Sequence, residues 1–174
     1  MTILHGDNRF YNNIFVQKWP KENYQVFSDS APDEPGQGEN REVGTHVFDD
    51  YPTYDEWISH SQMDEDIPKM RELEQFHFSH LPIWAKGNVY LAGAEAWKKE
   101  RDFFTDKDSE ISLELVEEKG QYRLQTNLYD VMKDFRADLV HTQTLGKVFE
   151  PDQDFENNDG TPISFNKDYF GNHR

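Results

Sequence analysis

Apolar and polar residues alternate in a short stretch near the start of the chain. Residues 6–16 read GDNRFYNNIFV, with Ile14 and Val16 at alternate positions. A period of two is typical of a β-strand with one buried face. Asn12 and Asn13 come directly before this strand, and asparagine tolerates the left-handed backbone conformation of a bend. Because stacked asparagines can form ladders, the pattern predicts one coil of a right-handed parallel β-helix, with both asparagines as structural turn residues.

A second segment repeats this pattern more weakly. Residues 81–91 read LPIWAKGNVYL, and aligning Asn88 with Asn13 places NVYL opposite NIFV. We expect Asn88 to be the equivalent turn residue, and residues 17–83 to form a long excursion between the two coils. Solenoids need roughly three or more repeats to close a core. The chain therefore either contains further coils or pairs with coils from elsewhere.

The clearest local signal lies in residues 111–126, where two alternating segments flank the turn sequence EEKG. This predicts an antiparallel hairpin with one face against the core and the other in solvent. Thr53 and Glu56 form a capping-box pattern that predicts a short helix to about His60. The remaining predictions are a long loop over 19–41, helical turns over 67–76 and 127–135, and a strand or loop over 142–149. The predicted fold is a single domain, residues 1–174, mainly β with a few short helices and long loops.

Composition narrows the range of partners. The 174 residues contain 34 acidic and 18 basic side chains, for a net charge of −16, which would repel nucleic acid and anionic membranes. With 35% hydrophobic residues and a mean hydropathy of −0.96, the chain is polar for an independent globule, so we expect a fragment or a partner-dependent piece. No apolar run is long enough for a signal peptide or a membrane span, and we expect a cytoplasmic protein.

We find no complete catalytic or metal-binding motif. Adjacent coils lie about 4.8 Å apart, close to the roughly 5–5.5 Å that separates the carboxyl groups of retaining glycosidases. The alignment nevertheless puts Pro82 opposite Asp7 and Trp84 opposite Arg9, so no acid faces Asp7 and we assign no catalytic residue. His77 and His80 lack a third ligand, and the acidic residues that follow Asp152 depart from a calcium loop at two positions, so no metal is expected. The chain has no cysteine and no nucleotide-binding or serine-hydrolase motif, and we expect no cofactor.

Tryptophan side chains could contact a sugar. Trp19 and Trp84 are the candidates for stacking on sugar rings, although packing is the commoner fate of a tryptophan.

Several segments together resemble the C-terminal portion of the parallel β-helix β-xylosidases of glycoside hydrolase family 120. These segments are residues 6–15 (GDNRFYNNIF), 87–91 (GNVYL), 144–146 (TLG), 155–163 (FENNDGTPI) and 168–171 (DYFG). The resemblance implies a right-handed parallel β-helix, oligomers, and retaining action on xylobiose and short xylo-oligosaccharides. It also implies that the catalytic aspartate and glutamate lie on coils preceding the matched region, so the chain alone would be inactive.

Three functions remain open at this stage. The first is the C-terminal part of a β-xylosidase-like hydrolase, which would complete and cap the β-helix and associate with upstream coils or with itself. The second is a non-catalytic carbohydrate-binding or assembly module. The third is a small hydrolase that completes its site between subunits.

Overall fold

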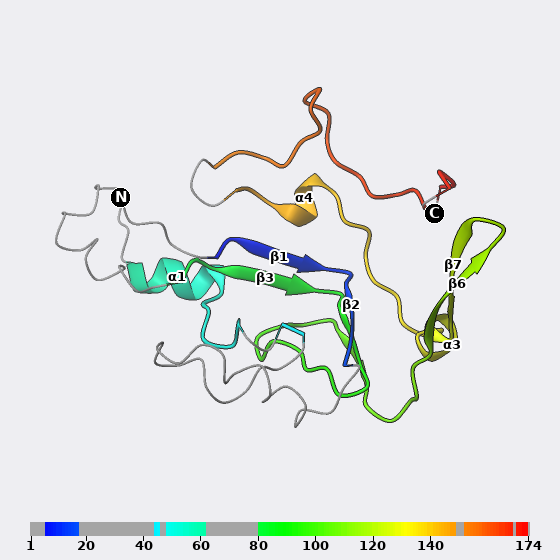
Figure 1. The fold of residues 1–174 in the computed structure, drawn as a ribbon. Helices are drawn as coiled ribbons and strands as arrows, with labels where there is room; N and C mark the ends of the chain where they lie inside the picture. Colours follow the sequence, from blue (N-terminus) through cyan, green and yellow to red (C-terminus); the bar gives the residue numbers. More distant parts are fainter. Residues whose placement is uncertain are drawn as a thin grey trace, which may run out of the picture. The chain divides into compact units, whose positions relative to one another are not determined.

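The structure, a computed structural model, describes residues 6–17, 44–45, 48–61, 80–148, 152–168 and 170–173 (Figure 1). The sequence predictions for residues 19–41 and 67–76, and those for Trp19 and His77, lie outside these ranges. Contacts divide the chain into two compact units. The first unit comprises Met1–Tyr11, Tyr51–Trp84 and Ala137–Arg174; the second comprises Asn12–Asp50 and Ala85–Arg136. Each is described by itself.

The second unit contains a three-stranded parallel sheet. Its strands are β2 (Ile14–Val16), β4 (Val89–Leu91) and β5 (Phe104–Asp106), in the order β2-β4-β5. Ile14 is paired with Val89, and Val89 in turn with Phe104. This register confirms the alignment of NIFV with NVYL. The third strand, β5, is an addition that the sequence pattern did not predict.

Left-handed residues form the bends beside these strands. Asn12 has φ 56°, and Gly87, directly before Asn88, has φ 71°. The Gly87 amide donates to the Asp102 carbonyl at 3.0 Å, and Asp102 itself has φ 58°. Glycine, asparagine and aspartate adopt this conformation more readily than other residues, so the corner residues of successive strands can superpose.

One side of this sheet is covered by the segment that follows the hairpin. Val89 and Leu91 pack with Leu128, which belongs to the short helix α3 (Leu128–Val131). Partly buried apolar side chains extend this cluster: Val16, Phe104, Ile111, Val131, Met132 and Phe135. The helical turn predicted over 127–135 is therefore confirmed, and its Leu128 packs against Val89 and Leu91 of β4.

The predicted antiparallel hairpin is confirmed, but its burial is not. Strands β6 (Leu113–Glu118) and β7 (Gln121–Thr126) pair with Leu115 opposite Leu124. Lys119 and Gly120 both have positive φ, as a two-residue type I′ turn requires. Leu115 is 68% exposed and Leu124 is 58% exposed. The prediction that one face packs on the core was wrong, because alternation sets which face is apolar and not what covers it.

The first unit combines short strands, helices and an irregular C-terminal segment. Strand β1 (Asn8–Tyr11) pairs with β3 (Ile83–Lys86), whose first two residues belong to this unit, and both arrows run in the same direction (Figure 1). The capping box forms as predicted: Thr53 N donates to Glu56 Oε2 at 2.8 Å, and Glu56 N donates to Thr53 Oγ1 at 3.2 Å. Helix α1 (Tyr54–Ser61) follows.

One local prediction in this unit was wrong. Residues 142–149 were expected to form a strand or loop, but Thr142–Leu145 form a helical turn, α4. The His141 side chain accepts a hydrogen bond from the Thr144 amide at the start of this turn.

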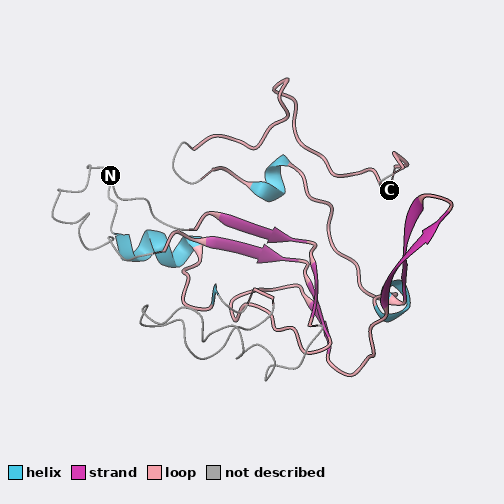
Figure 2. Ribbon diagram, in the orientation of Figure 1, coloured by secondary structure: helices cyan, strands magenta, loops and turns pink. Residues whose placement is uncertain are grey.

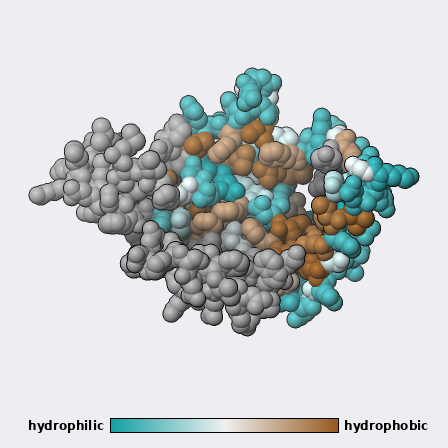
Figure 3. All heavy atoms as spheres, viewed as in Figure 1, coloured by the Kyte–Doolittle hydropathy of each residue, from teal (hydrophilic) through white to brown (hydrophobic). Residues whose placement is uncertain are grey.

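In total the described residues are mainly β with a few short helices, and contain both parallel and antiparallel pairing (Figure 2). Apolar and polar side chains are intermixed on the described part of the face in Figure 3.

Candidate functional site

A chain of side-chain hydrogen bonds crosses the corner of the parallel sheet in the second unit. Asn13 donates to Asn88 Oδ1 twice, from its backbone N at 2.9 Å and from Nδ2 at 3.0 Å. Asn88 Nδ2 then donates to Glu100 Oε1 at 2.7 Å. We call Asn13, Asn88 and Glu100 the corner ladder. Asn88 is completely buried and Glu100 is 5% exposed, so the ladder runs from the surface to the interior.

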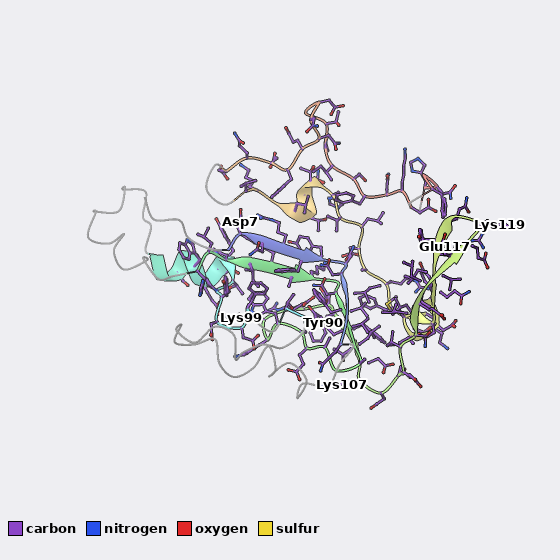
Figure 4. All side chains as sticks on the ribbon, viewed as in Figure 1. Asp7, Tyr90, Lys99, Lys107, Glu117 and Lys119 are labelled. Atoms are coloured by element: carbon purple, nitrogen blue, oxygen red, sulfur yellow. The ribbon has the colours of Figure 1, made fainter. Side chains whose placement is uncertain are left out.

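Glu100 is also bound by a second set of buried groups. Tyr90 donates its hydroxyl to Glu100 Oε2 at 2.5 Å, and the Thr45 hydroxyl lies 2.7 Å from the Tyr90 oxygen (Tyr90 is labelled in Figure 4). The Trp97 amide donates to Thr45 Oγ1 at 2.9 Å. Because the Tyr90 hydroxyl donates its hydrogen bond to Glu100, the Thr45 hydroxyl is the donor in its bond to Tyr90. The hydrogen bonds from Trp97 through Thr45 and Tyr90 therefore all lead toward the carboxyl group.

Burial favours the neutral form of both acidic groups in this network. It raises the pKa of the Glu100 carboxyl above its ordinary value, and the hydrogen bonds from Tyr90 and Asn88 oppose this shift only in part. Burial, followed by the Glu100 hydrogen bond, raises the pKa of the Tyr90 hydroxyl. A shifted carboxyl group can mark a catalytic acid. Here both carboxyl oxygens are occupied by protein donors and the side chain is buried, so the arrangement ends the ladder and braces the corner.

The first unit holds a buried arginine between two aromatic rings. The Arg9 guanidinium carbon lies 4.1 Å from the centroid of Trp84 and 4.6 Å from that of Phe155. Its Nε donates to the Leu145 carbonyl at 2.8 Å, and its side chain is only 7% exposed. Asp7, labelled in Figure 4, pairs with Arg9 Nη1 through Oδ1 at 2.5 Å. A planar, five-donor cation is suited to this combination of stacking and hydrogen bonding.

The site residues predicted from the sequence have different surroundings in the structure. The half-buried Trp84 ring carries Arg9 on its face and lies 6.2 Å from the Tyr54 ring, so at least part of its surface already packs within the chain. Asn12 has a positive φ, and Asn13 and Asn88 belong to the corner ladder. The opposition of Arg9 and Trp84 in the sequence alignment is confirmed by their contact.

No sequence pattern indicated that Glu100 is a buried acid. It follows Trp97 and two lysines, without a spacing that marks a buried acid. For Arg9 a signal was present, because residues at equivalent positions of adjacent coils are expected to touch.

No metal site forms among the described residues, which contain no group of three possible ligands. His80 stacks on Tyr51 with 3.8 Å between ring centroids, and Asp152 accepts a hydrogen bond from Lys147 at 3.1 Å. Within the same residues, no helix is sufficiently long and apolar to cross a bilayer.

Comparisons with known proteins give one informative result. No protein-family model and no curated protein matches the chain. Among solved structures, "The complex structure of XylC with xylose" matches with a TM-score of 0.71 and 27% sequence identity. The match covers 97% of this chain and 23% of the XylC chain, so this chain spans less than a quarter of XylC. Nearly the whole chain is therefore similar in fold to one part of a xylose-binding protein.

Proposed function

We propose that this chain is the C-terminal part of a β-xylosidase-like glycoside hydrolase, and that it completes and caps a right-handed parallel β-helix. Catalytic carboxylates would be supplied by coils outside this chain. The substrate class would be xylo-oligosaccharides, bound by the complete enzyme.

The observation that carries this proposal is the parallel register of β2 and β4 together with the likeness to XylC. The paired segments are 75 residues apart in sequence and still superpose residue for residue, as coils of a solenoid do. The XylC chain is more than four times as long as the part that matches, which leaves room for preceding coils. The xylose named with XylC supports a pentose-containing substrate.

Two features of the chain support its role as the end of a solenoid. Among the described residues β5 is the last strand of its sheet, and the corner ladder ends shortly before β5 on Glu100, whose Oε1 accepts from Asn88. After β5 the chain leaves the parallel arrangement and forms the antiparallel hairpin β6-β7.

The test combines the isolated chain with a chimera. The isolated chain should release no nitrophenol from 4-nitrophenyl β-D-xyloside. A chimera in which this chain replaces the matched part of XylC should fold and bind xylose, while XylC lacking that part should not. Turnover by the isolated chain, or undiminished xylose binding by the shortened XylC, would contradict the proposal.

A sugar-binding module is the competing function. It predicts that the isolated chain binds xylo-oligosaccharides without turnover, in calorimetric titrations, and that Trp84→Ala abolishes the binding. Under our proposal the isolated chain shows no such binding, and Trp84→Ala changes only its stability.

A further inference from the structure

The corner ladder has a direction. Asn13 donates its side-chain amide to Asn88, and Asn88 donates its own to Glu100. The Asn88 oxygen accepts from Asn13, which precedes it along the ladder, and each amide nitrogen donates to the residue after it. The two ends of such a ladder differ: one end needs an acceptor and the other needs a donor.

At the Glu100 end of the ladder the required acceptor is present. At the Asn13 end, the described residues supply no donor. Glu100 provides the final acceptor. At the other end, Asn13 uses its backbone groups and its side-chain nitrogen in bonds to the Asn88–Val89 corner. Its side-chain oxygen accepts no hydrogen bond from the described residues. The equivalent oxygen of Asn88 accepts two and is fully buried.

Strand β2, which follows Asn13, also lacks a described neighbour on the side of this oxygen. Among the described residues, β2 has the β4 strand on one side only. Ile14 is 44% exposed, whereas Val89, its partner in the same column, is 3% exposed. Phe15 stacks on Tyr90 with rings 5.1 Å apart and 6° from parallel, and Phe15 remains partly exposed. An apolar column and an aromatic stack therefore both stop at β2.

We infer that the open edge of β2 binds one further parallel coil of the pattern asparagine, apolar, aromatic, apolar, whose asparagine donates its amide to Asn13 Oδ1. This inference rests on the proposed function and names the chemistry of the coil that joins the chain. The backbone of that coil pairs with β2, its aromatic ring extends the Phe15–Tyr90 stack, and its apolar residues cover Ile14. Residues 88–91 (NVYL) have this pattern already.

A second copy of this chain fits the edge less well. Two β2 edges related by a two-fold axis would present two Asn13 oxygens, both acceptors, and each copy carries a net charge of −16. The polarity of the ladder therefore selects a coil from a longer polypeptide, consistent with the fourfold greater length of XylC.

The test uses a peptide probe and leaves the protein unchanged. The probe is a capped peptide with the sequence of residues 85–93 (AKGNVYLAG), titrated into ¹⁵N-labelled chain. We expect shifts of the Asn13 side-chain amide and of the β2 backbone amides. A control peptide with Asn88→Leu keeps the size but loses the amide donor, and should bind about fivefold more weakly, as expected for one neutral hydrogen bond. A peptide with Tyr90→Pro should not bind, because proline blocks strand pairing.

The outcomes separate this inference from the proposed function. Absence of shifts at β2 at millimolar peptide, or equal binding by the Asn88→Leu peptide, would overturn the inference and leave the proposed function standing. Hydrolysis of the aryl xyloside by the isolated chain would overturn the proposed function without affecting the peptide result.

Discussion

Among single residues, Glu100 combines deep burial with a group that can ionise. Its raised pKa means that folding favours the protonated acid. The stability that Glu100 contributes is therefore fully present below the unfolded-state pKa, about 4.3, and is lost as the pH rises through the higher folded-state pKa. Tyr90 stays neutral throughout this window, because the ordinary tyrosine pKa of 10.0 already lies above it and burial raises the Tyr90 pKa further.

Glu100→Gln should consequently change stability in a pH-dependent way. Glutamine keeps an oxygen for Asn88 and cannot ionise, so the melting temperature of the variant should rise relative to wild type between pH 4 and pH 8. Thermal melts followed by circular dichroism measure this difference. Glu114→Gln, an exposed change on β6, serves as the control. A pH-independent difference for Glu100→Gln would contradict the argument.

In the first unit, Arg9 is the charged residue that combines an ion pair, hydrogen bonds and ring stacking. Arg9→Lys keeps the charge but loses the planar fork and most of the contact with Trp84 and Phe155. We expect a loss of about 2 kcal/mol in the free energy of unfolding. Urea titration monitored by tryptophan fluorescence gives the value. Arg123→Lys, whose side chain is 67% exposed, should cost less than about 0.5 kcal/mol; equal losses would mean that the stack carries no energy.

The elements that could be predicted from the sequence are those in which local pattern and long-range packing agree. The alignment of Asn13 with Asn88 was predictable because both precede the same alternation and can occupy a bend. Strand β5 was missed because Phe103 stands at the ladder position, where an asparagine would have marked a coil. Glu100, from outside any strand, performs the asparagine's role.

Other elements depend on contacts that no local pattern encodes. The turn α4 is held by distant residues: the Thr142 amide donates to the Ile163 carbonyl, and its hydroxyl donates to the Phe155 carbonyl. The hairpin turn could be predicted from the sequence, since Lys119 and Gly120 close a two-residue loop beside Glu117 (Figure 4). The exposure of the hairpin strands could not be predicted.

A matched pair of leucines tests the difference between the sheet and the hairpin. Leu91 is completely buried in β4, and Leu115 is 68% exposed on β6. Leu91→Ala should lower the free energy of unfolding by about 3 kcal/mol because it leaves a cavity. Leu115→Ala should lower it by less than about 0.5 kcal/mol. Chemical denaturation of both variants distinguishes the elements, and a comparable loss from Leu115→Ala would show that the hairpin face packs against something in solution.

For the whole molecule, net charge and an open strand edge act against each other. A charge of −16 repels a second copy at low ionic strength, whereas the exposed edge of β2 favours pairing. Added salt weakens the repulsion between surface charges, because the screening length falls from about 30 Å at 0.01 M to about 3 Å at 1 M. Apolar contacts and backbone pairing are not weakened in this way.

Self-association of the isolated chain should therefore depend on salt and on β2. Light scattering should give a monomer at about 0.01 M salt and a mass that rises with protein concentration at about 1 M. Ile14→Lys places a charge on the edge and should restore the monomer at high salt, as lysines do on natural edge strands. Leu115→Lys, an equal change on the hairpin, should leave the association intact. If the hairpin variant and not Ile14→Lys restored the monomer, the contact between copies would belong to β6 and β7.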